Sequence, residues 1–392
     1  MTTFEWTLWT RSPTFGWVGI IEDYIDATLT PVYCDVGTWS ITLSASAAQA
    51  ANLVQPGWGI IAVRDGTIVL SGPATNRKHS VQRNGENDVH QIVVSGVTDE
   101  VFLKRRLVSP SPAQTVPPYD AQVSDIRSGV ASTVLSQYAD VNAGPGAVAA
   151  RRTPGLTIAT DPVVGVSVSG NGRWDSNLLA FLQPLATSGG VGFRVAQVGA
   201  GIQFQVFTPT DRTSTARFSS GLGNLAGYEY ESTAPDTNYA FVGASGTGTT
   251  RIIQEYPDPS SIADWGRIEG PLINQSDTAD PTQLQQSATD AFATNGEQAS
   301  LTVTPIETPT MTYGVHYGLG DKVTVQLDQP VATPYAESGQ IRDVLRSVEI
   351  KLTVDGPQTV TPAVGTPARA DVSRLFRRLL QLDKRVNYLE GK

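Results

Sequence analysis

The sequence predicts a mainly β protein with an inserted α/β module and a C-terminal coiled-coil helix. Three observations support this fold class. Short alternations of apolar and polar residues, separated by glycine and asparagine turns, fill residues 4–97 and return after Asp211. Between these two β regions, apolar residues recur at helical spacing. Residues 371–392 carry a heptad repeat.

The first β region is clearest at residues 38–44 (TWSITLS), where large apolar and small polar residues alternate as in a half-buried strand. Asp65-Gly66 lies between two apolar runs, which is a strong hairpin signal. Short strands joined by such turns are typical of a sandwich or barrel, so residues 1–107 are expected to form a β-barrel domain. Its further strands are expected at 59–63, 67–71 and 89–95.

The pattern changes after the proline-rich stretch 108–118, which we interpret as a domain boundary. A second helix is expected from Leu178, with Asp175 or Ser176 as its N-cap. Apolar strands at 191–195 and 202–207 follow, so residues 108–215 are expected to form the inserted α/β module. The first helix of this module is predicted over 120–138 from an apolar face of Val123, Ile126, Val130, Val134, Leu135 and Tyr138.

Residues 216–366 again read as β and are expected to form a second β-barrel domain. One helix is predicted within this region, at 281–292. The predicted strands are 239–243, 299–304, 322–327, 341–353 and 359–362.

The heptad repeat of residues 371–392 predicts a coiled coil that joins copies of the chain. The alternative is an amphipathic helix lying on its own domain, and the heptads alone leave a dimer or a trimer open. The expected oligomerisation residues are Val372, Leu379 and Val386 at position a, Leu375, Leu382 and Leu389 at position d, and the complementary pairs Arg378 with Asp383 and Arg385 with Glu390.

Composition excludes several classes of protein. A single cysteine, Cys34, rules out an intrachain disulfide scaffold. We find neither a secretory signal nor an apolar run long enough to span a bilayer, so no membrane anchor is expected and synthesis is placed in the cytoplasm. The net charge of −9 argues against electrostatic binding of DNA by the whole surface.

No motif predicts catalysis, so we expect no enzymatic activity and no catalytic, cofactor-binding or metal-binding residues. The three histidines, His79, His90 and His316, are far apart in sequence and form no HxH or HExxH pair. Cys34 lacks an activating histidine nearby in the sequence and is interpreted as a small half-buried residue. The stretch 165–170 (GVSVSG) misses the GxSxG pattern of a nucleophile elbow, and there is no phosphate-binding loop. The seven tryptophans suit a core or interface, with a sugar-binding surface as the alternative.

Several stretches together resemble phage tail-hub proteins, especially the minor tail proteins of actinobacteriophages. These are GIIAVRDGTIVLSG at 59–72, IVVSGV at 92–97, LKRR at 103–106, DRT at 211–213, FSSGLGNL at 218–225, NYAFVG at 238–243 and YGLGDKV at 317–323. They follow the order seen in that family and cover most of residues 1–365.

The resemblance implies two related tube-like β-barrels in each chain and assembly as a homotrimer, so that six barrels form a pseudo-sixfold ring. It also allows strands from about 216–250 to complete the first barrel. The implied location is the tail tip of the virion. The implied partners are distal-tail and tail-tube proteins, the tape-measure protein, and tail-fibre or receptor-binding proteins, with phage DNA only passing through the channel.

The resulting hypothesis is a structural hub of a phage tail tip or baseplate that joins the tail tube to the adsorption apparatus and lets DNA pass. An acidic ring would suit this role because a like-charged wall does not bind the duplex. The chain ends directly after the heptads, so we expect wall hydrolysis and receptor recognition to belong to other proteins. The alternative is a trimeric carbohydrate-binding or carbohydrate-cleaving tail spike. A bacterial surface adhesin is disfavoured because no signal peptide is found.

Overall fold

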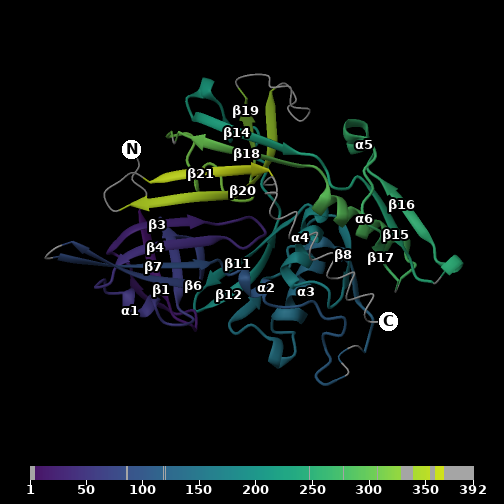
Figure 1. Ribbon diagram of the computed structural model, residues 1–392, viewed down its shortest axis with the longest axis horizontal. Helices are drawn as coiled ribbons and strands as arrows, with labels where there is room; N and C mark the ends of the chain where they lie inside the picture. The colour runs from purple at the N-terminus through teal and green to yellow at the C-terminus, as the bar shows by residue number, and fades with distance from the viewer. Residues whose placement is uncertain are drawn as a thin grey trace.

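The computed structural model describes residues 5–84, 87–117, 119, 121–246, 248–276, 278–306, 308–327, 339–353 and 358–365. Within these ranges the chain forms a large curled sheet, an α/β module on one side of it, and a smaller module beyond (Figure 1). The predicted coiled coil at 371–392 lies outside the described residues. No helix among the described residues is both long and apolar enough to cross a membrane.

The large sheet has 13 strands, and both β regions of the sequence contribute to it. Eleven of them follow the order β14-β18-β21-β20-β3-β4-β7-β6-β5-β1-β2, while β19 pairs with β20 and β13 with β19. The N-terminal β segment contains β1 (Trp6–Arg11), β2 (Trp17–Ile20), β3 (Tyr24–Thr30), β4 (Thr38–Ser44), the short helix α1 (Ala50–Leu53), β5 (Gly59–Arg64), β6 (Thr67–Asn84) and β7 (Asn87–Val97). The C-terminal β segment contains β13 (Arg217–Phe218), β14 (Leu225–Thr233), β18 (Gln298–Pro305), β19 (Lys322–Gln326), β20 (Gln340–Thr353) and β21 (Thr359–Gly365).

The alternation seen in the sequence determines which side of the sheet is buried. Trp39, Ile41 and Leu43 of β4 are buried and point to the core, while the residues between them are half-buried, as predicted. The hairpin between β5 and β6 is also confirmed, since Arg64 pairs with Thr67 across Asp65-Gly66. Asp65 and Gly66 both have positive φ, at 47° and 78°, which is the backbone of a type I′ turn.

The two β segments meet where β20 pairs with β3, and they share one hydrophobic core. Leu8 and Trp39 from the first segment belong to the same buried cluster as Phe218 and Val323 from the second. The described strands therefore form one open sheet, where the sequence suggested two barrels. The strand that pairs with β3 of the N-terminal segment is β20. The resemblance suggested strands from about 216–250 for this position, but β14, which lies in that range, is at the end of the sheet path, separated from β20 by β18 and β21.

The α/β module, residues 101–207, is built around a second hydrophobic cluster, to which Phe15, Tyr33 and Val344 of the β segments also contribute. It contradicts the predicted helix over 120–138, because residues 125–130 form a strand in register with β10 and a helix begins only at Ala131. Val123 and Ile126, counted as part of the helix face, are 72% and 48% exposed. The module contains α2 (Val101–Lys104), β8 (Asp125–Val130), α3 (Ala131–Ala143), β9 (Leu156–Ile158), β10 (Ser167–Gly172), α4 (Leu178–Gly189), β11 (Gly192–Val198) and β12 (Gly201–Phe207).

A second insertion, the satellite module at residues 234–297, interrupts the C-terminal β segment. Thr233 at the end of β14 pairs directly with Gln298 at the start of β18, so the whole module occupies the loop of one hairpin. It has a small core in which Val242 and Leu284 are buried. Its elements are β15 (Tyr239–Gly243), β16 (Ile253–Pro257), α5 (Pro259–Trp265), β17 (Ile273–Asn274) and α6 (Pro281–Asn295), which confirm the predicted strand at 239–243 and the helix from Pro281.

Candidate functional site

A cavity of about 750 Å³ lies where the N-terminal β segment, the α/β module and the loop at 313–319 come together. The sheet contributes Arg64 and Ser71 to its wall, β11 contributes Phe193, and the loop contributes Tyr313. Strand β11 lies beside β6 at this junction (Figure 1). The cavity thus marks the seam at which the inserted module is attached to the sheet.

A buried ion pair holds this seam together. The Arg11 guanidinium at the end of β1 donates to both carboxylate oxygens of Asp99, at 2.6 and 2.7 Å. Ser71 on β6 donates to the same carboxylate at 2.6 Å, and Arg11 also donates to Gln197 on β11 at 3.0 Å. Both charged side chains are almost completely buried. This network joins two strands of the sheet to one strand of the α/β module.

On the side of β11 that does not pair with β12, two buried side chains accept hydrogen bonds from the backbone. The Phe193 amide donates to the Cys34 thiol sulfur at 3.2 Å, and the Val195 amide donates to the Glu100 carboxyl at 3.0 Å. Burial raises the pKa of Glu100 to about 7 and that of Cys34 to about 12. The Cys34 thiol and the Glu100 carboxyl thus provide hydrogen-bond acceptors for two backbone amides of β11 that are buried in the seam.

The chemistry of the seam favours packing over turnover. A thiol with a pKa of about 12 is protonated at neutral pH and is a poor nucleophile. Ser169, which stands where the GxSxG pattern would need its second glycine, lies within β10 and hydrogen-bonds Ser128. Across the described ranges, no group of three or more His, Cys, Asp or Glu side chains is placed to hold a metal ion.

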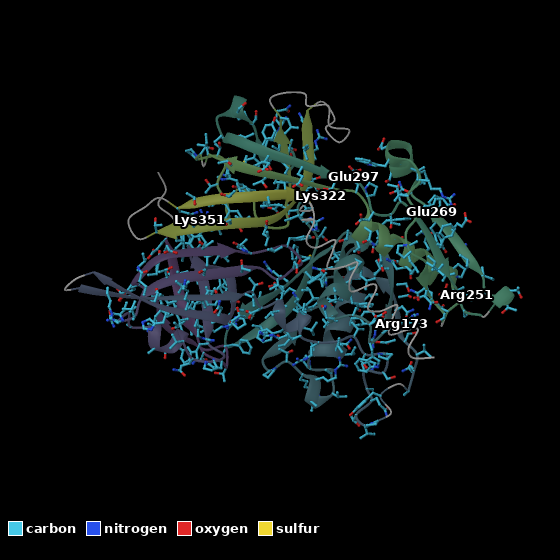
Figure 2. All side chains as sticks on the ribbon, in the orientation of Figure 1. Arg173, Arg251, Glu269, Glu297, Lys322 and Lys351 are labelled. Atoms are coloured by element: carbon cyan, nitrogen blue, oxygen red, sulfur yellow. The ribbon has the colours of Figure 1, made fainter. Side chains whose placement is uncertain are left out.

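Polar side chains attach the satellite module to the α/β module. Gln275 accepts hydrogen bonds from Arg173 at 2.7 Å and from Asn171 at 3.0 Å. On α6, Gln283 donates to the Ser169 hydroxyl. Figure 2 shows Arg173 below Arg251 on the side of the molecule that carries the satellite module. This contact contrasts with the apolar core shared by the two β segments.

Among the described strands, the path through the large sheet ends in β2 on one side and β14 on the other, and each has a described partner on one side only. Strand β2 exposes apolar side chains, with Trp17 38%, Val18 48% and Ile20 39% accessible. Such an edge can pair with another chain, and soluble proteins normally cover or charge it. An exposed apolar edge strand is therefore a candidate assembly surface.

The structure describes only some of the residues that the sequence singled out. The ten expected oligomerisation residues lie beyond the described ranges. Trp39 is buried in the core, in line with the core interpretation of that residue, and Trp17 lies on the exposed edge. Sequence analysis missed the roles of Arg11, Asp99 and Glu100. Their only signal was charge beside apolar strands, which is too common to identify a buried network.

The family comparison matches residues 5–366 to the model of the Siphovirus ReqiPepy6 Gp37-like proteins. No curated protein matches the sequence. Among the solved structures that match, three share the fold over almost the whole chain, all at low sequence identity. The 43 kDa tail protein of prophage MuSo2 from Shewanella oneidensis has a TM-score of 0.57 at 12% identity, covering 92% of this chain and 98% of its own.

The other two structures give the same result. Prophage tail protein gp18 from Listeria monocytogenes has a TM-score of 0.55 at 7% identity, with 96% of this chain and 99% of that one covered. A tail protein from Neisseria meningitidis has a TM-score of 0.53 at 15% identity, with 92% and 96% covered. These findings confirm the expected relationship to phage tail proteins. The chain belongs to the family of Siphovirus ReqiPepy6 Gp37-like proteins and has a phage tail protein fold.

Proposed function

We propose that this protein is a structural hub of the phage tail tip, which assembles as a homotrimeric, pseudo-sixfold ring between the tail tube and the adsorption apparatus. The observation that carries the proposal is the match of fold to three tail proteins over more than 90% of the chain, together with the family match. The two β segments of one chain would supply two of the six positions in the ring.

The free edges of the sheet support the ring. In a head-to-tail ring, β2 of one copy would lie against β14 of the next, so that every contact is heterologous and the ring closes. This arrangement would cover Trp17, Val18 and Ile20, which an isolated chain leaves exposed. The heptads at 371–392 would then add a coiled coil along the threefold axis.

In the proposed tail, the ring contacts the distal-tail and tail-tube proteins, the tape-measure protein, and the tail-fibre or receptor-binding proteins.

DNA would pass through the channel of the ring without being bound. The net charge of −9 supports this, because a like-charged wall repels the duplex. We expect no retention of duplex DNA on filters at physiological salt; tight retention would contradict a passive channel.

The test of the ring is the native mass of the full chain and of a variant ending at Pro367, measured by light scattering. Three copies of the 41.7 kDa chain weigh about 125 kDa. A trimeric full chain with a monomeric truncation supports a ring held by the heptads. A dimer would contradict the threefold symmetry, and so would a monomer that stays monomeric when mixed with its tube partner.

Edge pairing can be tested separately by disulfide trapping, because the native Cys34 is buried and does not compete. Two single variants, Ile20→Cys on β2 and Glu231→Cys on β14, are mixed and oxidised. We expect a covalent dimer between the two variants. The matched control replaces Ile25, which is 44% exposed on β3 but lies on a strand paired on both sides. Equal trapping of Ile25→Cys with Glu231→Cys would overturn the edge-to-edge contact.

A further inference from the structure

Strands β6 and β7 continue beyond the large sheet as a two-stranded arm. Strand β5 pairs with β6 only as far as Pro73, and β4 pairs with β7 only from Gln91 onward. Beyond these points β6 and β7 pair only with each other, up to Asn84 and Asn87. Figure 1 shows the arm projecting from the left of the molecule, away from the α/β module.

The register of the arm brings together two of the chain's three histidines. His79 pairs with Ile92 and Val81 pairs with His90, so the two histidines are diagonal neighbours on one face of the ladder. Their ring centres are 5.8 Å apart, with 27° between the ring planes. Both side chains are exposed to solvent. Sequence analysis treated the two histidines as unrelated, because eleven positions separate them and they form no recognised metal-binding motif.

We propose that His79 and His90 form a two-ligand binding site for a divalent transition-metal ion such as Zn²⁺ or Ni²⁺. When two imidazoles hold one tetrahedral zinc at about 2.0–2.1 Å from each nitrogen, their ring centres are about 5 Å apart. The observed 5.8 Å is close to this value, and small rotations of two exposed side chains are enough to reach it. Water or a side chain of a neighbouring tail protein would take the remaining coordination positions.

Two arginines of β6 lie on the same face as the pair: Arg77, and Arg83, which is opposite Asp88 in the ladder. Arg77 lies on the same face of β6, but its guanidinium donates to the backbone carbonyls of Leu53 and Gln55 and is thus held toward the body of the sheet. Lys78 lies one position from His79, so its side chain leaves the opposite face of the strand. The whole chain carries a net charge of −9, which attracts cations. Metal coordination needs an unprotonated ring nitrogen on each imidazole.

The experiment titrates ZnCl₂, and in parallel NiCl₂, into the untagged full chain by isothermal calorimetry at pH 7.5. We expect saturable binding of one ion per chain, weakened at least tenfold by either His79→Gln or His90→Gln. The matched control is His316→Gln. His316 accepts a hydrogen bond from the Thr312 amide through Nδ1 at 3.0 Å and is far from the arm in sequence.

Thermal melting of each variant without metal separates loss of a ligand from loss of the fold. Because His79 and His90 are exposed, their glutamine variants should melt like the wild type. Absence of saturable binding at pH 7.5 would overturn the proposal. So would binding that survives both arm substitutions, or binding that depends on His316 instead. The site does not rest on the ring, so either proposal can fail alone.

Discussion

At the scale of single residues, removing one partner of the buried Arg11–Asp99 pair should destabilise the fold more than removing one partner of an exposed ion pair. Asp99→Asn leaves the buried guanidinium without its counter-charge, and breaking such a pair costs about 3–5 kcal/mol. We therefore expect the free energy of unfolding in urea to fall by about 3 kcal/mol or more. A control, Lys351→Met, removes the exposed pair between Lys351 and Glu349 and should change stability by less than about 1 kcal/mol. Equal effects of the two substitutions would show that the buried network does not hold the seam.

Glu100 should make stability depend on pH between its two pKa values. The pKa is about 7 in the folded chain and 4.5 in the reference state, so the folded form holds the proton more tightly. The resulting contribution is full below pH 4.5, falls as the pH rises toward 7, and is absent above that. The difference amounts to about 3 kcal/mol. Urea melts at several pH values should show this slope, and Glu100→Gln should flatten it. An unchanged slope in Glu100→Gln would assign the dependence to other carboxyls.

Cys34 should be nearly inert to alkylation in the folded protein. Its sulfur is buried, accepts the Phe193 amide and has a pKa raised to about 12, so little thiolate forms at neutral pH. We expect iodoacetamide to label the native chain at pH 7.5 at least about 100-fold more slowly than the chain in guanidinium, as measured by mass spectrometry. Rapid labelling of the native chain would mean that the seam opens readily.

At the scale of elements, sequence periodicity succeeded where one element buries one face. The period of two at 38–44 corresponds to β4, whose inward residues are buried. The same reasoning failed at 120–138, because the spacing of Val123 and Ile126 fitted a helix face by coincidence. Pairing of β8 with β10, a contact with a distant segment, decided the strand instead.

The start of α4 offers a test of local sequence rules. Both Asp175 and Ser176 were plausible caps, but the Asn177 side chain accepts the Ala180 amide at 3.0 Å. Asn177→Ala should therefore lower the free energy of unfolding by about 1 kcal/mol, whereas Asn177→Asp should nearly preserve it. Ser176→Ala serves as the control and should have little effect in the same urea melts. If Ser176→Ala lowers the free energy of unfolding more than Asn177→Ala does, Ser176 and not Asn177 is the N-cap of α4.

At the scale of the whole molecule, long-range pairings set the architecture, and these lie beyond sequence periodicity. Strand β20 was predicted as a strand, but nothing in its sequence identifies β3 as its partner. The seam has the same origin, because Asp99 and Gln197 approach Arg11 only once the sheet and the α/β module have folded. Most helices and strands could therefore be predicted from local patterns. The strand order of the sheet and the buried network could not, because both depend on contacts between segments that are far apart in the sequence.

The satellite module should be removable without loss of the sheet. Thr233 and Gln298 are paired in the β14–β18 hairpin, so a two-residue Asn-Gly turn can replace residues 234–297. The excised residues take their own small core with them, and their contacts to the α/β module include the polar bonds of Gln275 and Gln283. We expect a soluble chain that still melts cooperatively in circular dichroism.

The contrasting variant removes residues 108–215. This deletion takes Gln197 away from Arg11 and leaves the Cys34 thiol without its amide donor, so this variant should fail to fold. If the variant without residues 234–297 is insoluble, the sheet depends on the satellite module. If the variant without residues 108–215 melts cooperatively, the sheet does not depend on the α/β module. Either result would contradict the prediction.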